Sequence, residues 1–184
     1  IVGLGWVGSS IAISTLQSGL ATELLLHDIR SDIAEGEAMD LAHGAAFYPY
    51  AEVRAADVSE MIDCDAVVVT AGRGGNADES RLDLLKDNAA IITSIAQELS
   101  GLKGLLVLVT NPVDIMVRVA AEASGLRPEQ VIGTGTMLDT ARLRQILGLE
   151  LGIDPRSAHA QVIGEHGDSE VVVWSGARIG GMPR

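Results

Sequence analysis

The chain has 184 residues, and its 13 Lys and Arg against 25 Asp and Glu give a formal net charge of −12. The basic residues are few and scattered, which argues against a protein that reads nucleic acids or binds anionic membranes, because each of these functions needs clustered cations. The 47% hydrophobic content excludes disorder as the main state, and no apolar run is long enough to span a membrane. The single cysteine, Cys64, excludes an internal disulfide and favours the cytoplasm.

Both ends of the chain predict a fragment of a longer protein. Only Ile1 and Val2 precede a glycine-rich turn that should follow a whole strand, and residues 180–184 read as an interrupted loop. The functional expectations below therefore refer to the intact protein.

Apolar runs alternate with helical periodicity along the chain. The runs rich in β-branched residues predict strands at 23–27, 52–55, 66–70, 105–110 and 130–132. Apolar spacing of three and four predicts helices at 9–18, 33–43, 82–99, 112–124 and 138–147. The runs at 66–70 and 105–110 are apolar on both faces, which predicts central parallel strands covered on both sides. The alternation indicates an α/β fold with a doubly wound parallel sheet.

The pattern changes toward the end of the chain. After Pro155, the strand-like runs at 158–163 and 170–174 have no crossover helix between them. We therefore expect a dinucleotide-binding Rossmann domain over residues 1–133, with its first strand truncated. Residues 134–184 should begin an α+β catalytic domain.

Three glycines form a GxGxxG motif between the short first strand and a helix. Gly3 allows a tight turn, Gly5 lets backbone approach a pyrophosphate, and Gly8 lets the helix pack close to the strand. Alone, the motif also fits a tight turn without a ligand. Asp28 ends the next strand, where its carboxylate can bind both adenosine ribose hydroxyls, so the two signals together predict dinucleotide binding. A carboxylate there favours NAD over NADP, although Arg30 leaves NADP open.

Polar residues near two later turns are candidates for the reaction. Asp139 and Arg142 share one face of a helix, but for these two alone a capping box with Thr136 and a surface ion pair are the favoured interpretations. His166 lies in a glycine-flanked turn, and a single histidine is more often structural than catalytic. No second histidine has metal-binding spacing, so we expect no metal.

A bound dinucleotide would change this balance. Oxidation of an alcohol by hydride transfer needs a base, and an imidazole titrating near neutral pH suits that role. Asp139 would then fix the tautomer of His166. One guanidinium would clamp a substrate carboxylate and a second would polarise the carbonyl, with Arg142 and Arg81 as candidates.

Several motifs together resemble the L-lactate/malate dehydrogenase family across essentially the whole chain. They are the GxGxxG, Asp28, MDLAHG at 39–44, ESRLDL at 79–84, TNPVD at 110–114, LDTAR at 138–142 and GEHGDS at 164–169. The resemblance implies that His166 is the acid and base, Asp139 its partner and Arg142 the carboxylate anchor. It further implies that Arg81 polarises the carbonyl from a closing loop and that Asn111 binds substrate and cofactor.

The same resemblance favours the lactate branch. The glutamate of GEHGDS is typical of lactate enzymes, and Gly75 stands in the closing loop, 71–78, where lactate enzymes carry Gln and malate enzymes Arg. Without a side chain at Gly75, a second substrate carboxylate has no Arg partner there, although Arg73 or Asn76 could reach in. Pyruvate and L-lactate are the first expectation. Malate dehydrogenase and a branched-chain hydroxyisocaproate dehydrogenase stay as alternatives.

Two further properties follow only from the resemblance. Arg144 and His159 match an effector site for fructose 1,6-bisphosphate in allosteric bacterial lactate dehydrogenases. Arg144 points about 200° away from Arg142 on a helix, which fits a second anion site, although a solvated Arg and His are the default interpretation. The family also implies a homo-oligomer, commonly a tetramer or dimer.

Two alternatives come from other classes. A dinucleotide-binding protein without chemistry would use Asp139, Arg142 and His166 only structurally. A short-chain dehydrogenase or sugar epimerase would need a Tyr-x-x-x-Lys base, and neither Tyr48 nor Tyr50 has a Lys at that offset.

Overall fold

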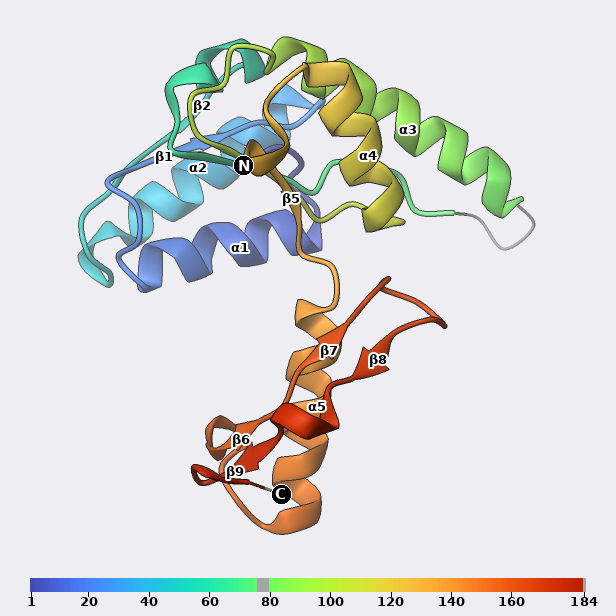
Figure 1. Cartoon of the computed structure of the whole chain (residues 1–184). Coiled ribbons are helices and arrows are strands. Elements are labelled where there is room, and N and C mark those ends of the chain that lie inside the picture. The colour runs from blue at the N-terminus through green and yellow to red at the C-terminus, as the bar shows by residue number, and fades with distance from the viewer. Residues whose placement is uncertain (76–79, 184) are drawn as a thin grey trace. The chain divides into compact units, whose positions relative to one another are not determined.

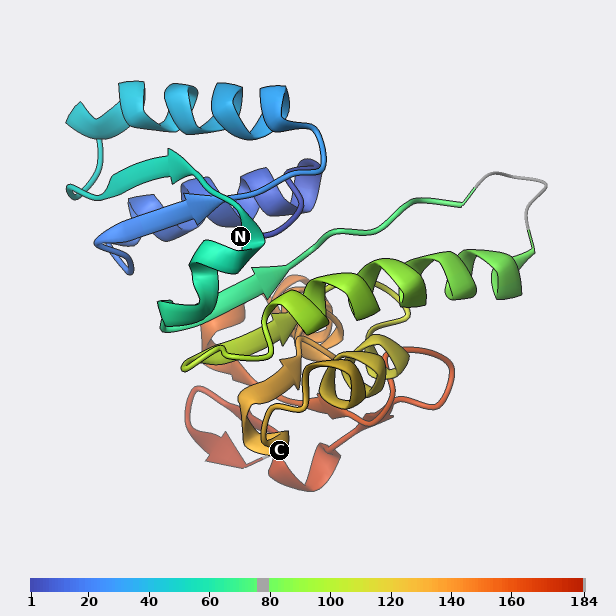
Figure 2. The same cartoon turned by 90° about the horizontal axis from the view of Figure 1, so that it is seen from above.

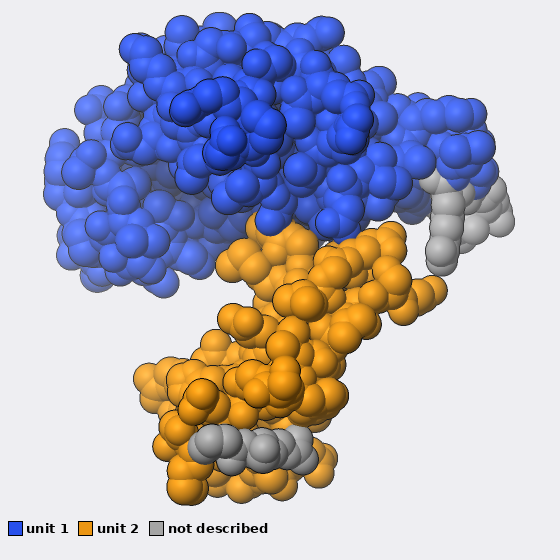
Figure 3. Space-filling view, viewed as in Figure 1, with its two compact units in different colours: residues 1–133 blue, residues 134–184 orange. Residues whose placement is uncertain are grey.

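The structure, a computed structural model, describes residues 1–75 and 80–183, without the side chains of Arg81 and Pro183. The chain separates into two units, Ile1–Gly133 and Thr134–Arg184, which Figure 3 colours separately. The unit boundary lies at the end of the last parallel strand. Each unit is described by itself below.

The strands of the first unit form one parallel arrangement. They are β1 (Glu23–Leu26), β2 (Glu52–Ala55), β3 (Ala66–Val69), β4 (Leu105–Leu108) and β5 (Val131–Gly133). β1 pairs with β2, and β3, β4 and β5 pair in that order. Val2 bridges in parallel to both His27 and Val69, so the short first strand joins the two groups. The resulting order, β2-β1-Val2-β3-β4-β5, is that of a doubly wound sheet and confirms the predicted fold class.

Helices connect these strands (Figure 1). They are α1 (Trp6–Gln17), α2 (Ser31–His43), α3 (Arg81–Glu98) and α4 (Val113–Ser124), with 3-10 turns at Gly44–Ala46, Val58–Asp63 and Pro128–Gln130. The predicted helix at 9–18 begins earlier, at Trp6, because Gly5 already takes the extended conformation of an N-cap. The predicted end of α4 is correct, since Gly125 adopts the left-handed conformation there.

Two apolar clusters lie on opposite faces of the sheet. Successive residues of a strand point to opposite faces, and β1 shows this directly: Leu25 belongs to one cluster, whereas Leu24 and Leu26 belong to the other. The first cluster includes buried residues of α3 and α4, which lie side by side in both views (Figures 1 and 2). The second includes buried residues of α1 and α2. Helices therefore contribute to the apolar layers on both sides of β1.

The prediction that the runs at 66–70 and 105–110 are covered on both faces was wrong, because β3 and β4 each bury only alternate residues. Leu106 and Leu108 are buried in the cluster with α3 and α4, whereas Leu105 is 41% exposed and Val107 is half-buried. The second cluster contains residues of α1, α2 and β1 and none of β4, so it does not cover that side of the strand. A continuous apolar run alone could not reveal this difference.

The second unit packs short strands against one helix. Its elements are α5 (Met137–Leu151), β6 (Ala158–His159), β7 (Val162–Ile163), β8 (Val171–Val172), β9 (Arg178–Ile179) and β10 (Met182–Pro183), with 3-10 turns at Pro155–Ser157 and Trp174–Gly176. β6, β9 and β10 form an antiparallel sheet, and β7 and β8 form a separate antiparallel pair. Among the helices that the structure describes, none combines the length and the apolar composition that a membrane span requires.

Two predictions for this unit need correction. The run at 158–163 is not one strand but two, β6 and β7, which pair with different partners. The helix predicted to end before Gly148 continues to Leu151 and ends at Gly152, which has a φ of +64°. Gly148 has another role, because a Cβ there would lie 2.8 Å from Pro155 Cγ. It allows a close approach of the following chain and does not stop the helix.

Candidate functional site

The glycine-rich turn lies where the strand order reverses, between β1 and β3. Ligands of doubly wound sheets bind outside the carboxyl ends of the strands at this point. Gly3 has a φ of +94°, and its N–H donates to His27 O over 2.8 Å. A Cβ on Gly3 would meet Ala71 N at 2.5 Å, and one on Gly8 would meet Gly3 O at 1.9 Å. The turn therefore tolerates no side chain at these two glycines.

Gly5 differs from the other two glycines of the motif. A Cβ on Gly5 would meet nothing within 4 Å, so the space above it is open. Gly5 is also the N-cap of α1, and no side chain caps this helix end. The N–H groups of the first turn and the positive end of the helix dipole are therefore available to an anion such as a pyrophosphate.

Asp28 follows β1 beside this turn. Its Oδ2 accepts from Leu4 N–H over 2.9 Å, and its Oδ1 accepts from Arg30 N–H over 3.1 Å. A carboxylate has about four acceptor positions, so each oxygen retains one for a ribose hydroxyl. The half-buried Asp28 and the open Gly5 fit the adenosine ribose and pyrophosphate of a dinucleotide.

The second unit brings Asp139 and His166 together. His166 Nδ1 lies 2.5 Å from Asp139 Oδ2, although the residues are 27 positions apart. The Asp139 side chain is 7% exposed and that of His166 is 23% exposed. An ionised carboxylate only accepts hydrogen bonds, so Nδ1 carries the proton and Nε2 faces away from Asp139. This arrangement can move a proton at Nε2 while Asp139 holds the ring.

Two threonines dock the loop of His166 onto α5. Thr136 Oγ1 donates to Val162 O over 2.7 Å, and Thr140 Oγ1 accepts from Val162 N–H over 3.0 Å. The predicted capping box of Thr136 with Asp139 is therefore wrong, because Thr136 makes no cap hydrogen bond. The sequence reasoning missed the role of Thr140. The sequence signal that could have revealed this role is the four-residue spacing of Thr136 and Thr140, which places both hydroxyls on one face of a helix.

Arg142 completes this cluster from the next turn of α5. Its Nη1 lies 3.2 Å from Asp139 Oδ1, and its side chain is 62% exposed. The predicted ion pair between these residues is therefore present. Its exposed guanidinium still has donors directed to solvent, so the pair is compatible with the clamping of a substrate carboxylate.

The pKa of Asp139 reflects opposing effects. Burial raises it, but the hydrogen bond and charge of His166, together with Arg142, outweigh burial and hold this pKa below its ordinary value. The carboxylate therefore stays ionised at neutral pH. An ionised Asp139 can stabilise an imidazolium when His166 takes up a proton.

The depressed pKa of Asp139 predicts a pH-dependent contribution to stability. The unfolded chain binds the Asp139 proton more tightly, so the stabilisation is complete above the ordinary carboxyl pKa of about 4. It is lost as the pH falls through that value and then through the lower pKa of the folded state. The free energy of unfolding of wild type should thus exceed that of Asp139→Asn at pH 7, and the difference should shrink by pH 3. Urea unfolding followed by circular dichroism measures both.

A second carboxyl group of this unit, that of Asp154, also titrates in the acid range. The hydrogen bonds from Arg156 lower the pKa of Asp154 to about 2, so this exposed residue adds acid sensitivity of its own. Measuring Asp154→Asn at the same pH values separates the two contributions. A difference between wild type and Asp139→Asn that stays constant from pH 7 to 3 would contradict the role of Asp139.

The other predicted site residues lie on several elements. Asn111 is exposed after β4, and its carbonyl accepts from Asn88 Nδ2 over 3.3 Å. Arg81 begins α3, but its side chain lies outside the described structure. In the closing loop Gly75 is described and exposed, whereas residues 76–78 also lie outside the described residues.

The two candidate effector residues belong to the second unit. Arg144 lies on α5, with its Nη2 3.5 Å from Arg156 O, and His159 is exposed on β6. The β6–β9 pairing places Arg178 directly opposite His159. Cross-strand partners extend toward the same face, so a second basic residue accompanies His159 there.

One group of side chains in the described part of the chain has spacing that could hold a metal. Ligand atoms of Asp139, His166 and Glu170 lie within 4.8 Å of one another. Asp139 and His166 are already bonded to each other at 2.5 Å, too close for two ligands of one tetrahedral ion. We assign no metal here, and the absence of a metal stays a prediction.

Family models match nearly the whole chain. Residues 1–133 match the NAD binding domain of lactate/malate dehydrogenase, and residues 136–184 match the alpha/beta C-terminal domain of the same family. The chain belongs to the lactate/malate dehydrogenase family. The family resemblance of its motifs is thereby confirmed, and so is the prediction of NAD as the cofactor.

Two similar relatives are both L-lactate dehydrogenases. The chain is 47% identical to an L-lactate dehydrogenase of Treponema denticola over 183 residues, and 49% identical to one of Kosmotoga olearia over 188 residues. These alignments cover 98% and 100% of this chain but 58% of each relative. The chain thus spans less than two thirds of the length of these curated relatives.

Solved dehydrogenase structures show the same fold. A minor L-lactate dehydrogenase from Enterococcus mundtii, crystallised with ligands, superposes with a TM-score of 0.94 at 44% identity. A lactate dehydrogenase from a deep-sea metagenome library gives the same TM-score at 46% identity. Each match covers 99% of this chain and 59% of the solved one.

Proposed function

We propose that the intact protein is an NAD-dependent L-2-hydroxy acid dehydrogenase that interconverts pyruvate and L-lactate. The observation that carries this proposal is the hydrogen bond between His166 and the buried Asp139. Such a pair provides an oriented acid and base, as alcohol oxidation needs. Relatives named L-lactate dehydrogenase, at 47% and 49% identity, support the choice of substrate.

The residues of the chain divide the chemistry between them. When bound, NAD supplies the hydride acceptor for oxidation, and its reduced form supplies the hydride donor for reduction. His166 Nε2 takes the hydroxyl proton of lactate during oxidation and gives a proton to the carbonyl oxygen of pyruvate during reduction. Asp139 keeps Nδ1 protonated and stabilises the imidazolium. This pair accounts for the proton of the reaction in both directions.

Three further residues would bind and polarise the substrate. Arg142 presents an exposed guanidinium to the substrate carboxylate. By the family resemblance, Arg81 polarises the carbonyl and Asn111 contacts both substrate and cofactor. On the cofactor side, the turn at Gly3, Gly5 and Gly8 would hold the pyrophosphate, and Asp28 the ribose. These roles are proposals that mutation can test residue by residue.

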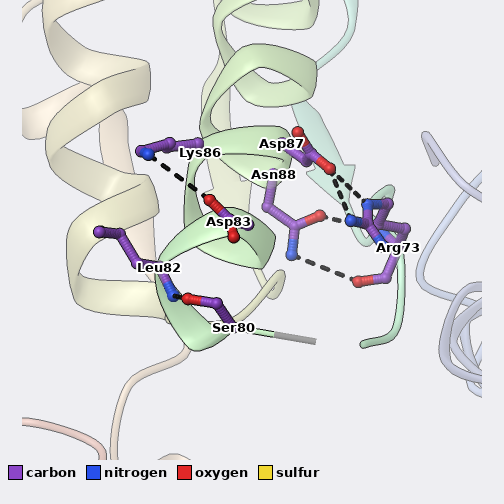
Figure 4. A network of polar contacts seen from close by, with 7 residues as sticks. All are labelled: Arg73, Ser80, Leu82, Asp83, Lys86, Asp87 and Asn88. Atoms are coloured by element: carbon purple, nitrogen blue, oxygen red, sulfur yellow. Dashed lines mark hydrogen bonds and ion pairs between the residues drawn. The ribbon is translucent and has the colours of Figure 1, made fainter. Parts of the chain in front are cut away.

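Two observations favour pyruvate over oxaloacetate. Gly75 has no side chain to pair with a second substrate carboxylate. Arg73, the other candidate cation, has its Nη2 2.6 Å from Asp87 Oδ2 (Figure 4). A guanidinium engaged by a carboxylate of its own chain is a weaker partner for a substrate, because the existing ion pair must first be broken.

Steady-state assays of the full-length protein test this proposal. NADH oxidation is measured with pyruvate, oxaloacetate and 2-oxoisocaproate, and NADPH is compared with NADH. We expect the highest kcat/KM with pyruvate and NADH. A preference for oxaloacetate would support malate dehydrogenase, and a preference for 2-oxoisocaproate would support the branched-chain alternative. No turnover of any 2-oxo acid, despite NADH binding, would support a non-catalytic dinucleotide-binding protein.

A second anion site is a separate proposal for the same protein. Arg144 and His159 would bind fructose 1,6-bisphosphate as an activator, and the position of Arg178 opposite His159 supports an anion-binding face. The assay above is repeated with the bisphosphate, which should raise kcat/KM for pyruvate. An unchanged kcat/KM would contradict the effector site. We further propose a cytoplasmic homo-oligomer, a tetramer or a dimer.

A further inference from the structure

Asn88 is a buried polar residue on α3 that the reaction chemistry above does not use. Asn88 is only 3% exposed to solvent. A buried carboxamide needs hydrogen-bond partners, because a buried polar group without a partner destabilises the folded state. The partners that Asn88 has are therefore informative about its role.

Asn88 bonds to backbone in two separate loops. Its Oδ1 accepts from Arg73 N–H over 2.9 Å, and its Nδ2 donates to Arg73 O over 3.4 Å. Figure 4 shows this double contact, with the Arg73–Asp87 ion pair beside it. The same Nδ2 donates to Asn111 O over 3.3 Å. One carboxamide thus joins segments that lie 15 residues before it and 23 residues after it.

Both loops leave the same edge of the sheet. β3 and β4 pair in parallel, with Val69 opposite Leu108, and each loop follows the carboxyl end of its strand. Thr110 Oγ1 donates to Ala71 O over 2.7 Å, which links the loops at a point nearer the strands. Asn88 links them farther out, at the residue whose side chain is proposed to bind substrate and cofactor.

The position of the Asn111 side chain depends on its backbone. Asn111 is exposed, and within the described part of the chain no hydrogen bond holds its carboxamide group. The backbone of Asn111 therefore sets the point from which that group reaches toward a ligand. Asn88 is the side chain that fixes the carbonyl of this peptide.

We infer that Asn88 is a positioning residue for the dehydrogenase reaction, which orients Asn111 by holding its peptide and that of Arg73 in one arrangement. The inference rests on the proposed function. Asn88 touches neither substrate nor cofactor in this account, and it acts only through Asn111. Loss of its two donated hydrogen bonds should therefore lower the rate of turnover more than it weakens the binding of NADH at the glycine turn.

Two substitutions test this inference in the full-length protein. Asn88→Asp keeps the size and one acceptor but replaces the donor with an oxygen that faces two carbonyls. Asn88→Ala removes the carboxamide without burying a charge, and it serves if the Asp variant does not fold. We expect each folded variant to lower kcat for pyruvate more than tenfold, with Kd for NADH within threefold of wild type. Stopped-flow turnover and NADH fluorescence measure the two quantities.

The matched control is the neighbouring residue of α3. Asp87→Asn weakens the exposed ion pair with the Arg73 side chain but leaves the backbone contacts of Arg73 intact, so kcat should stay within twofold of wild type. Folded Asn88→Ala with wild-type kcat and KM would overturn the inference while the proposed function stands. An equal loss of NADH binding and kcat would indicate a general structural role and would also overturn it. An inactive wild type would overturn the proposed function, and the inference with it.

Discussion

Replacing His166 with Gln is expected to lower kcat for pyruvate reduction by about 10²- to 10⁴-fold, the range for loss of a general acid and base. Glutamine can occupy the position of the imidazole ring and donate a hydrogen bond to Asp139, but it cannot exchange a proton at neutral pH. The buried Asp139 would keep a hydrogen-bond partner, so the effect should fall on turnover more than on folding. Single-turnover oxidation of bound NADH by pyruvate measures the chemical step directly.

The control uses the same substitution at a histidine outside the proposed site. His43 is exposed in the last turn of α2, so His43→Gln should leave kcat within twofold of wild type. Circular dichroism and NADH binding show that both variants are folded. If folded His166→Gln retains more than a tenth of the wild-type kcat, another group must transfer the proton.

The second large effect is expected at Gly8. A Cβ there would lie 1.9 Å from Gly3 O and 2.9 Å from Thr70 Oγ1, and Thr70 Oγ1 donates to that same carbonyl over 2.8 Å. Gly8→Ala must therefore push α1 away from the turn or break this hydrogen bond. We expect a loss of about 1–3 kcal/mol in the free energy of unfolding, as for other overpacked sites. The displaced helix end should also weaken NADH binding more than tenfold.

Gly36 provides the matched control for this substitution. It lies within α2, it is exposed, and a Cβ there would meet nothing within 4 Å. Gly36→Ala should therefore stabilise the protein by about 0.5–1 kcal/mol, because alanine favours helix over glycine. Urea unfolding and NADH fluorescence titration compare the two variants. Unchanged NADH affinity in Gly8→Ala would contradict the role of the glycine turn.

Local sequence signals predicted the presence of the helices and strands well, but they predicted the first and last residues of these elements less well. The alternation of strands and helices indicated the doubly wound sheet, because period and length are properties of neighbouring residues. Gly148 was misjudged as a helix stop, because the glycine is needed there to let Pro155 pack closely against the helix. The strand run at 158–163 was misjudged as one element, because its two halves pair with different strands. Each error reflects a tertiary contact that local spacing and periodicity do not report.

The order of the amino acids was enough to indicate the family of this protein, the spacing of its glycine turn and a set of candidate reactive residues. These are fixed by residue type and order, and they can be read before any folding. The tertiary structure added that the predicted contact between His166 and Asp139 uses Nδ1 of the ring, and it alone revealed that Asn88 joins the loops of Arg73 and Asn111. Such bonds form between side chains and peptides many residues apart, which become neighbours when the sheet and helices pack.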